Sequence, residues 1–402
     1  MSRVRAAVVG GGIIGVAVAR QLTRSLGNVD VTVFEKESEL AAHQTGHNSG
    51  VVHAGLYYEP GSLKARLCRR GVELLQEFTA GKGVGYEECG KVVVAHNASE
   101  LGRLEAIHGR AIANGVPDVR MINADELAAV EPHARGLAAL HSPRTAIVDY
   151  RAVTNALAGD VTDAGGTVAL GVAVTGIEER GPEIRVASTS GTEVYDLVIT
   201  CAGLQSDRLA HASGDPANPR IVPFFGDYYL LRPEKRGLVK GLIYPVPDPR
   251  YPFLGVHLTK RIDGAIMVGP NAFLAAGREA YRRTQVSPGD LGEVLGFPGF
   301  WRFAAGNLPT AAREARLVVN SRAFVEEARK YVPELQAGDV TRGPRGIRAQ
   351  AMTRDGSLVD DFVITGTNRL VHVRNAPSPG ATSSMAIAEH IVSEAMDRAS
   401  LS

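Results

Sequence analysis

Near its N-terminus the chain carries the segment VVGGGIIG, in which glycines at residues 10, 12 and 15 have the spacing GxGxxG. A short apolar run at residues 5–9 precedes them, and apolar residues at helical spacing follow at residues 13–26. A second apolar run at residues 31–34 ends at Glu35. This order of strand, glycine turn, helix and strand predicts a βαβ unit, and therefore an α/β fold with a Rossmann-like domain.

Each glycine of this segment has a separate task in a dinucleotide site. Gly10 permits the tight turn, Gly12 lets the backbone approach a pyrophosphate, and Gly15 lets the helix pack on the strand. Glu35, followed by Lys36, stands where an acidic residue binds a ribose hydroxyl. The complete pattern predicts a site for the ADP half of a dinucleotide.

The glycine pattern alone does not separate NAD from FAD, because both contain ADP. Two later segments favour FAD. The long loop TGHNSGVVHAGLYY at residues 45–58 offers small polar residues and backbone N–H groups to a pyrophosphate and a flavin. The segment NAPSPGATSS at residues 375–384 opens a helix, whose N-terminal N–H groups would stabilise the negative charge of a reduced flavin.

Length and composition limit the other classes of function. A chain of 402 residues exceeds the size of one hydrophobic core, so two domains are expected. The formal net charge of +1 gives no basic field for nucleic acid. Three widely separated cysteines form neither a disulfide framework nor a metal site, which favours a reducing cytosol and no bound metal.

The chain also lacks the marks of a membrane-inserted or exported protein. Arg3 and Arg5 precede an apolar run, as in a signal peptide, but the three consecutive glycines and Arg20 favour a buried strand and helix. No apolar stretch reaches the roughly 18 residues that a spanning helix needs, so any membrane contact would be peripheral. We expect a cytoplasmic protein, with the inner face of the membrane as a second location.

Periodicity predicts the remaining elements. Helices are expected at residues 63–82, after a Ser99 cap, from an Asp149 cap to residue 164, within 299–331 and at 382–396. Strands are expected at 91–96, 167–170, 172–178, 184–188 and 197–200, and an antiparallel sheet with strands at 243–246, 253–258 and 265–268. We therefore assign residues 1–85, 145–215 and 340–402 to a discontinuous FAD-binding domain. Residues 86–144 and 216–339 are assigned to an α+β substrate domain with a mixed or antiparallel sheet.

At these residues the sequence resembles the D-amino-acid oxidase and glycine oxidase superfamily of flavoproteins, and within it the L-2-hydroxyglutarate dehydrogenases and oxidases. The resemblance covers nearly the whole chain and rests on these segments: VVGGGIIG, FEKE, TGHNSGVVHAGLYY, LVITCAGLQSD, PFFGDYY, PFLGVHLTKRIDG, GIRAQ and RNAPSPGATSS. It implies a tightly held FAD, a split FAD domain and oxidation of L-2-hydroxyglutarate to 2-oxoglutarate by hydride transfer to flavin N5.

The resemblance also implies positions for the cofactor contacts. Beside the glycines, Glu35 and Lys36, these positions are Thr45, His47, Asn48, Ser49, Val174, Gly203, Gly380, Ala381 and Thr382. Several of these contacts would be made by the backbone. The sequence therefore supports the positions better than the individual side chains.

A 2-hydroxy dicarboxylate needs cations for its carboxylates and a base for its hydroxyl proton. Arg348 in GIRAQ resembles the superfamily arginine that binds the substrate carboxylate, which a planar guanidinium can hold with two hydrogen bonds. His53 and His257 are the candidates for the base, because imidazole titrates near neutrality. A surface ion pair for Arg348 and structural roles for the histidines are the alternatives.

Five further residues are expected near the substrate. One or two of four tyrosines should touch it, namely Tyr57, Tyr58, Tyr228 and Tyr229. Arg374 would support the flavin or the distal carboxylate. Oxygen or a quinone would take the electrons. The rival functions are oxidation of an amino acid such as glycine with the same cofactor, an NAD-dependent dehydrogenase, and an inactive flavin-binding regulator.

Overall fold

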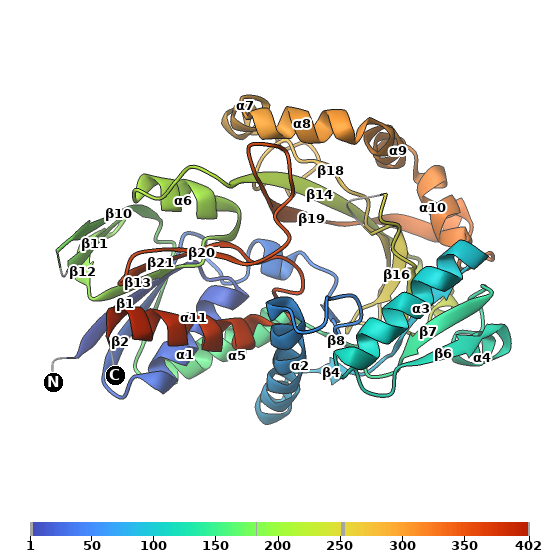
Figure 1. Cartoon of the computed structure of the whole chain (residues 1–402), viewed down its shortest axis with the longest axis horizontal. Coiled ribbons are helices and arrows are strands. Elements are labelled where there is room, and N and C mark those ends of the chain that lie inside the picture. Colours follow the sequence, from blue (N-terminus) through green and yellow to red (C-terminus); the bar gives the residue numbers. More distant parts are fainter. Residues whose placement is uncertain (1–2, 182, 251–253, 401–402) are drawn as a thin grey trace.

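Two large sheets organise the protein, as Figure 1 shows. The structure is a computed structural model that describes residues 3–181, 183–250 and 254–400. One sheet has six strands and the other has nine, and two three-stranded sheets accompany them. This mixed α/β architecture confirms the predicted fold class.

The six-stranded sheet contains the predicted βαβ unit. Its order is β20 (Val363–Gly366), β21 (Leu370–Asn375), β13 (Leu197–Thr200), β1 (Val4–Val9), β2 (Val29–Glu35) and β9 (Thr167–Leu170). All neighbours pair parallel except β20, which runs antiparallel to β21. The strands come from the beginning, the middle and the end of the chain, so one sheet is assembled from separated segments.

Alternating residues of these strands pack against different layers. Ala6 and Val8 of β1 face four helices: α1 (Ile13–Ser25), α2 (Leu63–Lys82), α5 (Tyr150–Asp163) and α11 (Ser384–Ala399). Ala7 and Val9 face a small antiparallel sheet: β10 (Val174–Arg180), β11 (Glu183–Ser188) and β12 (Gly191–Tyr195). Both faces are covered, which explains why the strands read as continuous apolar runs.

The nine-stranded sheet forms the other half of the molecule. Its order is β18 (Phe273–Leu274), β14 (Arg220–Leu231), β17 (Ile266–Gly269), β16 (His257–Lys260), β15 (Leu242–Pro245), β5 (Lys91–Ala95), β7 (Ala138–Ser142) and β6 (Arg120–Asn123), with β19 (Val340–Met352) also paired to β14. The pairs are antiparallel, as predicted, except that β5 and β15 run parallel. The predicted division into domains placed residues from 340 onward in the FAD domain. Strand β19 (residues 340–352) instead pairs with β14 in this sheet.

Helices and a small sheet complete the fold. The helices are α3 (Ala98–Ala113), α4 (Ala124–Val130), α6 (Ser206–Ala212), α7 (Pro288–Leu295), α8 (Pro298–Gly306), α9 (Leu308–Val319) and α10 (Ser321–Arg329). The small sheet joins β3 (Val51–Val52), β8 (Ala146–Val148) and β4 (Tyr86–Glu87). Among the described residues, no helix combines the length and apolar character that crossing a membrane requires.

Several predicted boundaries hold and a few are corrected. Helix α2 has the predicted ends, and Asp149 caps α5 by accepting a hydrogen bond from the Arg151 N–H. Helix α3 is capped by Asn97 rather than Ser99, because the Asn97 side chain accepts from the N–H three residues later. The strand predicted at 253–258 begins at His257, and residue 253 lies outside the described residues.

Candidate active site

A cavity of about 880 Å³ runs between the two large sheets. Its walls come from the glycine turn after β1, the loop before β3, the loop before α11, and strands β14, β16 and β19. Cavities of about 300–1,000 Å³ are the usual size of ligand sites. All fourteen predicted cofactor residues line it: Gly10, Gly12, Gly15, Glu35, Lys36, Thr45, His47, Asn48, Ser49, Val174, Gly203, Gly380, Ala381 and Thr382.

The glycine turn leaves space on its cavity side. Gly10 has a φ of +116°, and a Cβ on it would lie 2.4 Å from the Cys201 carbonyl oxygen. A Cβ on Gly15 would lie 2.0 Å from the Gly10 oxygen, so this glycine is needed for close packing of helix on strand. A Cβ on Gly12 would meet only Thr45 Oγ1, at 3.4 Å. The residues therefore fit a pyrophosphate that approaches the backbone at Gly12.

The carboxylate of Glu35 is fixed at the end of β2. It accepts hydrogen bonds from the Gly11 N–H at 2.7 Å and the Glu37 N–H at 2.9 Å. Lys36 pairs instead with Glu37 and with Glu279, at 3.0 Å to the latter. Burial lowers the pKa of Lys36, but these carboxylates outweigh it and raise the pKa overall. The Glu35 carboxylate is thus held in place where it borders the cavity.

Side chains of the loop before β3 hold the loop itself. Thr45 Oγ1 accepts the Ile13 N–H of α1 at 3.1 Å. Asn48 donates to the Thr45 carbonyl at 2.7 Å and accepts the Gly50 N–H at 2.8 Å. The His47 ring stacks on Tyr281, with 4.1 Å between ring centroids. Because these side chains are engaged within the protein, the backbone of the loop forms much of this wall of the cavity.

The loop before α11 is tied to the same wall through Thr382. Its Oγ1 accepts the His53 N–H at 3.1 Å and lies 3.0 Å from the Tyr150 hydroxyl. Helix α11 begins at Ser384, two residues after the predicted start, so Gly380 and Ala381 lie in the turn that precedes it. Segments that are more than 300 residues apart in the sequence thus meet beside His53.

His53 and His257 both line the cavity. Burial lowers the pKa of each imidazole to about 3, and the positive charge of Lys91 adds to the effect on both. Each ring is therefore neutral at pH 7 and has a nitrogen lone pair. His257 Nδ1 lies 2.8 Å from the Gly255 carbonyl oxygen, which only accepts, so Nδ1 carries the proton and Nε2 is the basic atom.

Arg348 reaches the cavity from β19, where it pairs with Phe224 of β14. Burial lowers the pKa of its guanidinium, although Tyr228 and Glu314 act in the opposite direction. The group stays charged, because an arginine does not lose its proton in a protein. Its charge also helps to lower the pKa of His257, so a cation and a neutral imidazole stand close together.

The four tyrosines separate into one cavity residue and three others. Tyr228 lines the cavity. Tyr229 packs on Phe324 with 4.9 Å between ring centroids, because successive strand residues face opposite sides. Tyr57 and Tyr58 are not among the described residues that line the cavity. Tyr244 does line the cavity, with 4.0 Å between the centroids of its ring and the His257 ring. The sequence does not predict that β15 pairs with β16, so sequence patterns did not identify Tyr244.

Arg374 has a different role from the one expected. Its guanidinium donates to the carbonyl oxygens of Pro216, Asn218 and Pro219, at 2.8–3.3 Å. The residue is 2% exposed and holds the chain between α6 and β14. Although Arg374 borders the cavity, these bonds and an ion pair with Asp215 at 3.7 Å turn its charge toward the protein rather than toward a substrate.

The protein combines a Rossmann-type sheet with a glycine turn that opens onto the cavity. The same cavity is lined by an arginine and two neutral histidines. Together these features define a dinucleotide-dependent oxidoreductase. The family described as DAO, FAD dependent oxidoreductase, matches residues 5–394. The chain belongs to this family, and its cofactor is FAD.

Relatives and solved structures agree with this placement. The chain is 49% identical to a mitochondrial L-2-hydroxyglutarate dehydrogenase of Caenorhabditis elegans, over 97% of this chain and 93% of the relative. It is 47% identical to the protein of that name from Homo sapiens, over 97% and 88%. An FAD-bound L-alpha-glycerophosphate oxidase of Mycoplasma pneumoniae shares the fold, with a TM-score of 0.78, 23% identity, and coverage of 100% and 96%. So does a glycine oxidase of Geobacillus kaustophilus, with a TM-score of 0.71, 19% identity, and coverage of 98% and 95%.

Proposed function

We propose that this protein oxidises L-2-hydroxyglutarate to 2-oxoglutarate with FAD. The observation that carries the proposal is the similarity of 97% of the chain to relatives named for this activity, at 49% and 47% identity. The cavity adds the groups that such a substrate needs, because Arg348, His53 and His257 all border it.

The residues have separate tasks in this reaction. Arg348 holds the carboxylate next to the hydroxyl-bearing carbon through two parallel hydrogen bonds. One imidazole of the pair His53 and His257 accepts the hydroxyl proton. Burial keeps both rings neutral in the cavity, and the negative charge of a bound dicarboxylate would raise their pKa toward the range that suits a base. Tyr228 and Tyr244 exclude water from the same end of the cavity. Bound FAD would supply the two-electron acceptor for the hydrogen on the hydroxyl-bearing carbon.

Incubation of the purified holoenzyme with L-2-hydroxyglutarate and an artificial electron acceptor tests the proposal. We expect one equivalent of 2-oxoglutarate for each two-electron reduction of the acceptor. Glycine is the matched control, because the rival amine oxidation would use the same fold. Turnover of glycine without turnover of L-2-hydroxyglutarate would reject the proposal.

The acceptor and the location are further parts of the proposal. Repeating the assay with dissolved oxygen and with a soluble quinone shows which one re-oxidises the flavin. We propose a cytoplasmic location from the three unpaired cysteines. The relatives from Caenorhabditis elegans and Homo sapiens are named as mitochondrial proteins, so the comparisons do not support that location.

His53→Asn and His257→Asn identify the base. Removal of the base is expected to lower kcat by about 100- to 10,000-fold. Removal of the other histidine should mainly raise KM, because that ring only shapes the pocket. If both variants keep the wild-type kcat, the proton goes elsewhere.

A further inference from the structure

Lys91 is a buried cation that the reaction described above does not use. It stands at the start of β5, inside the nine-stranded sheet, and is 2% exposed. Its Cα pairs with Leu242 on one side and Ser142 on the other. Lysine is rarely buried to this extent without a charged partner. Its position therefore requires an explanation.

Aromatic rings surround the ammonium group. Lys91 Nζ lies 3.8 Å from the centre of the Tyr244 ring and 4.9 Å from the centre of the Tyr57 ring. Ring faces attract a cation, but more weakly than a carboxylate does in a buried site. Burial lowers the pKa of Lys91 to about 7, and no carboxylate of the described residues counteracts this shift.

One of these rings, Tyr244, connects Lys91 to the cavity, since Lys91 itself lies behind the residues that line it. Tyr244, whose ring contacts the ammonium, lines the cavity and stacks on His257. The charge of Lys91 acts on both His53 and His257, and that of Arg348 acts on His257. Lys91 on β5 is therefore near both histidines, and Arg348 on β19 is near His257.

We propose that Lys91 binds the second carboxylate of the substrate, the one remote from the hydroxyl group. This inference rests on the proposed function and names a group that determines substrate choice. Arg348 and Lys91 would hold the two ends of a dicarboxylate, with the hydroxyl-bearing carbon beside the histidines. The flexible four-carbon stem of lysine lets the ammonium move from the ring faces to a carboxylate that enters the cavity. Arg374, the other candidate for this carboxylate, is engaged by backbone carbonyls.

Binding of two unreactive acids to the holoenzyme tests the proposal. Glutarate has both carboxylates, whereas valerate has the same carbon chain with one. We expect Lys91→Met to weaken glutarate binding by about 10- to 100-fold, the range for one charge-assisted hydrogen bond, and to change valerate binding by less than about twofold. Calorimetric titration gives both constants without depending on turnover.

Lys260→Met is the matched control. Lys260 lies on β16, the strand of His257, but its ammonium pairs with Glu87, whereas no carboxylate of the described residues pairs with Lys91 in the same way. Its replacement removes the same charge and should leave glutarate binding unchanged. Equal glutarate affinity of the wild type and Lys91→Met would overturn the proposal, and so would an equal loss for both acids.

A crystal structure of the wild-type holoenzyme with glutarate covers the case in which Lys91→Met does not fold. We expect one carboxylate oxygen at about 2.7–2.9 Å from Lys91 Nζ. Placement of both carboxylates away from Lys91 would contradict the proposal. Failure of the wild type to oxidise L-2-hydroxyglutarate would reject the proposed function itself. Normal oxidation with unaltered glutarate binding in Lys91→Met would reject only the role of Lys91.

Discussion

At the scale of single residues, the cavity depends on polar groups that are held in place by neighbours from distant parts of the chain. Arg348 is the clearest case, because β14 and β19 pair along most of their length and fix where its guanidinium enters. A planar guanidinium can donate two parallel hydrogen bonds to one carboxylate, whereas an ammonium acts as a point charge. The geometry of the group should therefore matter as well as its charge.

We predict that Arg348→Lys lowers kcat/KM by about 10- to 100-fold, because one charge-assisted hydrogen bond is lost. FAD should remain bound, as measured by the absorbance of the purified protein. Arg342→Lys is the control, since Arg342 is exposed on the same strand. Wild-type kinetics for Arg348→Lys would place the carboxylate site elsewhere.

Residue positions were more predictable from the sequence than side-chain directions. All fourteen cofactor positions line the cavity, and all of them except Val174 belong to contiguous motifs. Tyr229 is one of four tyrosines of which one or two are expected at the substrate, and Arg374 is expected to support the flavin or the distal carboxylate. In the structure Tyr229 packs on Phe324, and Arg374 donates to backbone carbonyls. The direction of each side chain depends on strand pairing and on the path of residues 216–219. No local sequence pattern predicts either of these.

At the scale of elements, the turn between β1 and α1 must pack tightly on its neighbours and must also leave space for the cofactor. The turn itself needs Gly10 and Gly15, because a Cβ on either would collide with backbone oxygen atoms. Gly12 is different, since the only contact of its Cβ would be an ordinary one with Thr45. Bulk at residue 12 should therefore block the cofactor without breaking the turn.

We predict that Gly12→Val yields folded protein without bound FAD. The flavin absorbance should be lost, while the circular dichroism spectrum should match that of the wild type. Gly27→Val is the control, because a Cβ on Gly27 meets no atom within 4 Å. Retention of stoichiometric FAD by Gly12→Val would mean that the pyrophosphate lies away from this turn.

Elements with local signals were predicted well. Helix α2 carries its own boundaries, with a Ser62 cap at one end and a left-handed Gly83 at the other. The parallel pairing of β5 with β15 was not predictable, because about 150 residues separate the strands and no motif marks the contact. The position of Tyr244 in the cavity wall was therefore identified only from the structure.

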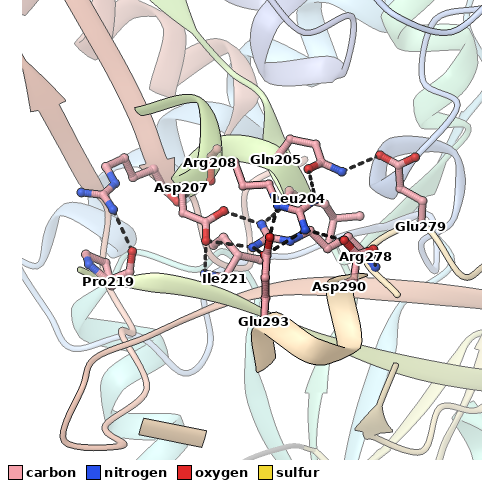
Figure 2. A network of polar contacts seen from close by, with 12 residues as sticks. Leu204, Gln205, Asp207, Arg208, Pro219, Ile221, Arg278, Glu279, Asp290 and Glu293 are labelled. Carbon is pink, nitrogen blue, oxygen red and sulfur yellow. Dashed lines mark hydrogen bonds and ion pairs between the residues drawn. The ribbon is translucent and has the colours of Figure 1, made fainter. Parts of the chain in front are cut away.

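At the scale of the whole molecule, a buried ion-pair network joins the two halves (Figure 2). Asp207 on α6 pairs with Arg278, which precedes α7, and the two side chains are 7% and 4% exposed. Arg278 also donates to the Leu204 carbonyl at 2.6 Å and lies 3.2 Å from Glu293. Removing one partner of a buried pair leaves the other charge uncompensated.

We predict that Arg278→Met lowers the free energy of unfolding by about 3–5 kcal/mol, because Asp207 stays buried without its cation. Urea unfolding of the holoenzyme, followed by circular dichroism, measures this change. Arg282→Met should change the value by less than about 0.5 kcal/mol, because Arg282 is exposed. A similarly small change in the free energy of unfolding for Arg278→Met would show that the network contributes little to stability.

From the proposed function and the role of Lys91, we expect the cavity to present one enantiomer of a 2-hydroxy dicarboxylate to FAD. Two carboxylates held at fixed sites leave only one arrangement in which the hydroxyl meets a histidine and the hydrogen on the carbon points to the flavin. The direct measurement is anaerobic mixing of the holoenzyme with each enantiomer, followed at the oxidised flavin band. We predict rapid bleaching with L-2-hydroxyglutarate and bleaching at least about 100-fold slower with the D enantiomer. Equal rates for the two enantiomers would contradict this prediction.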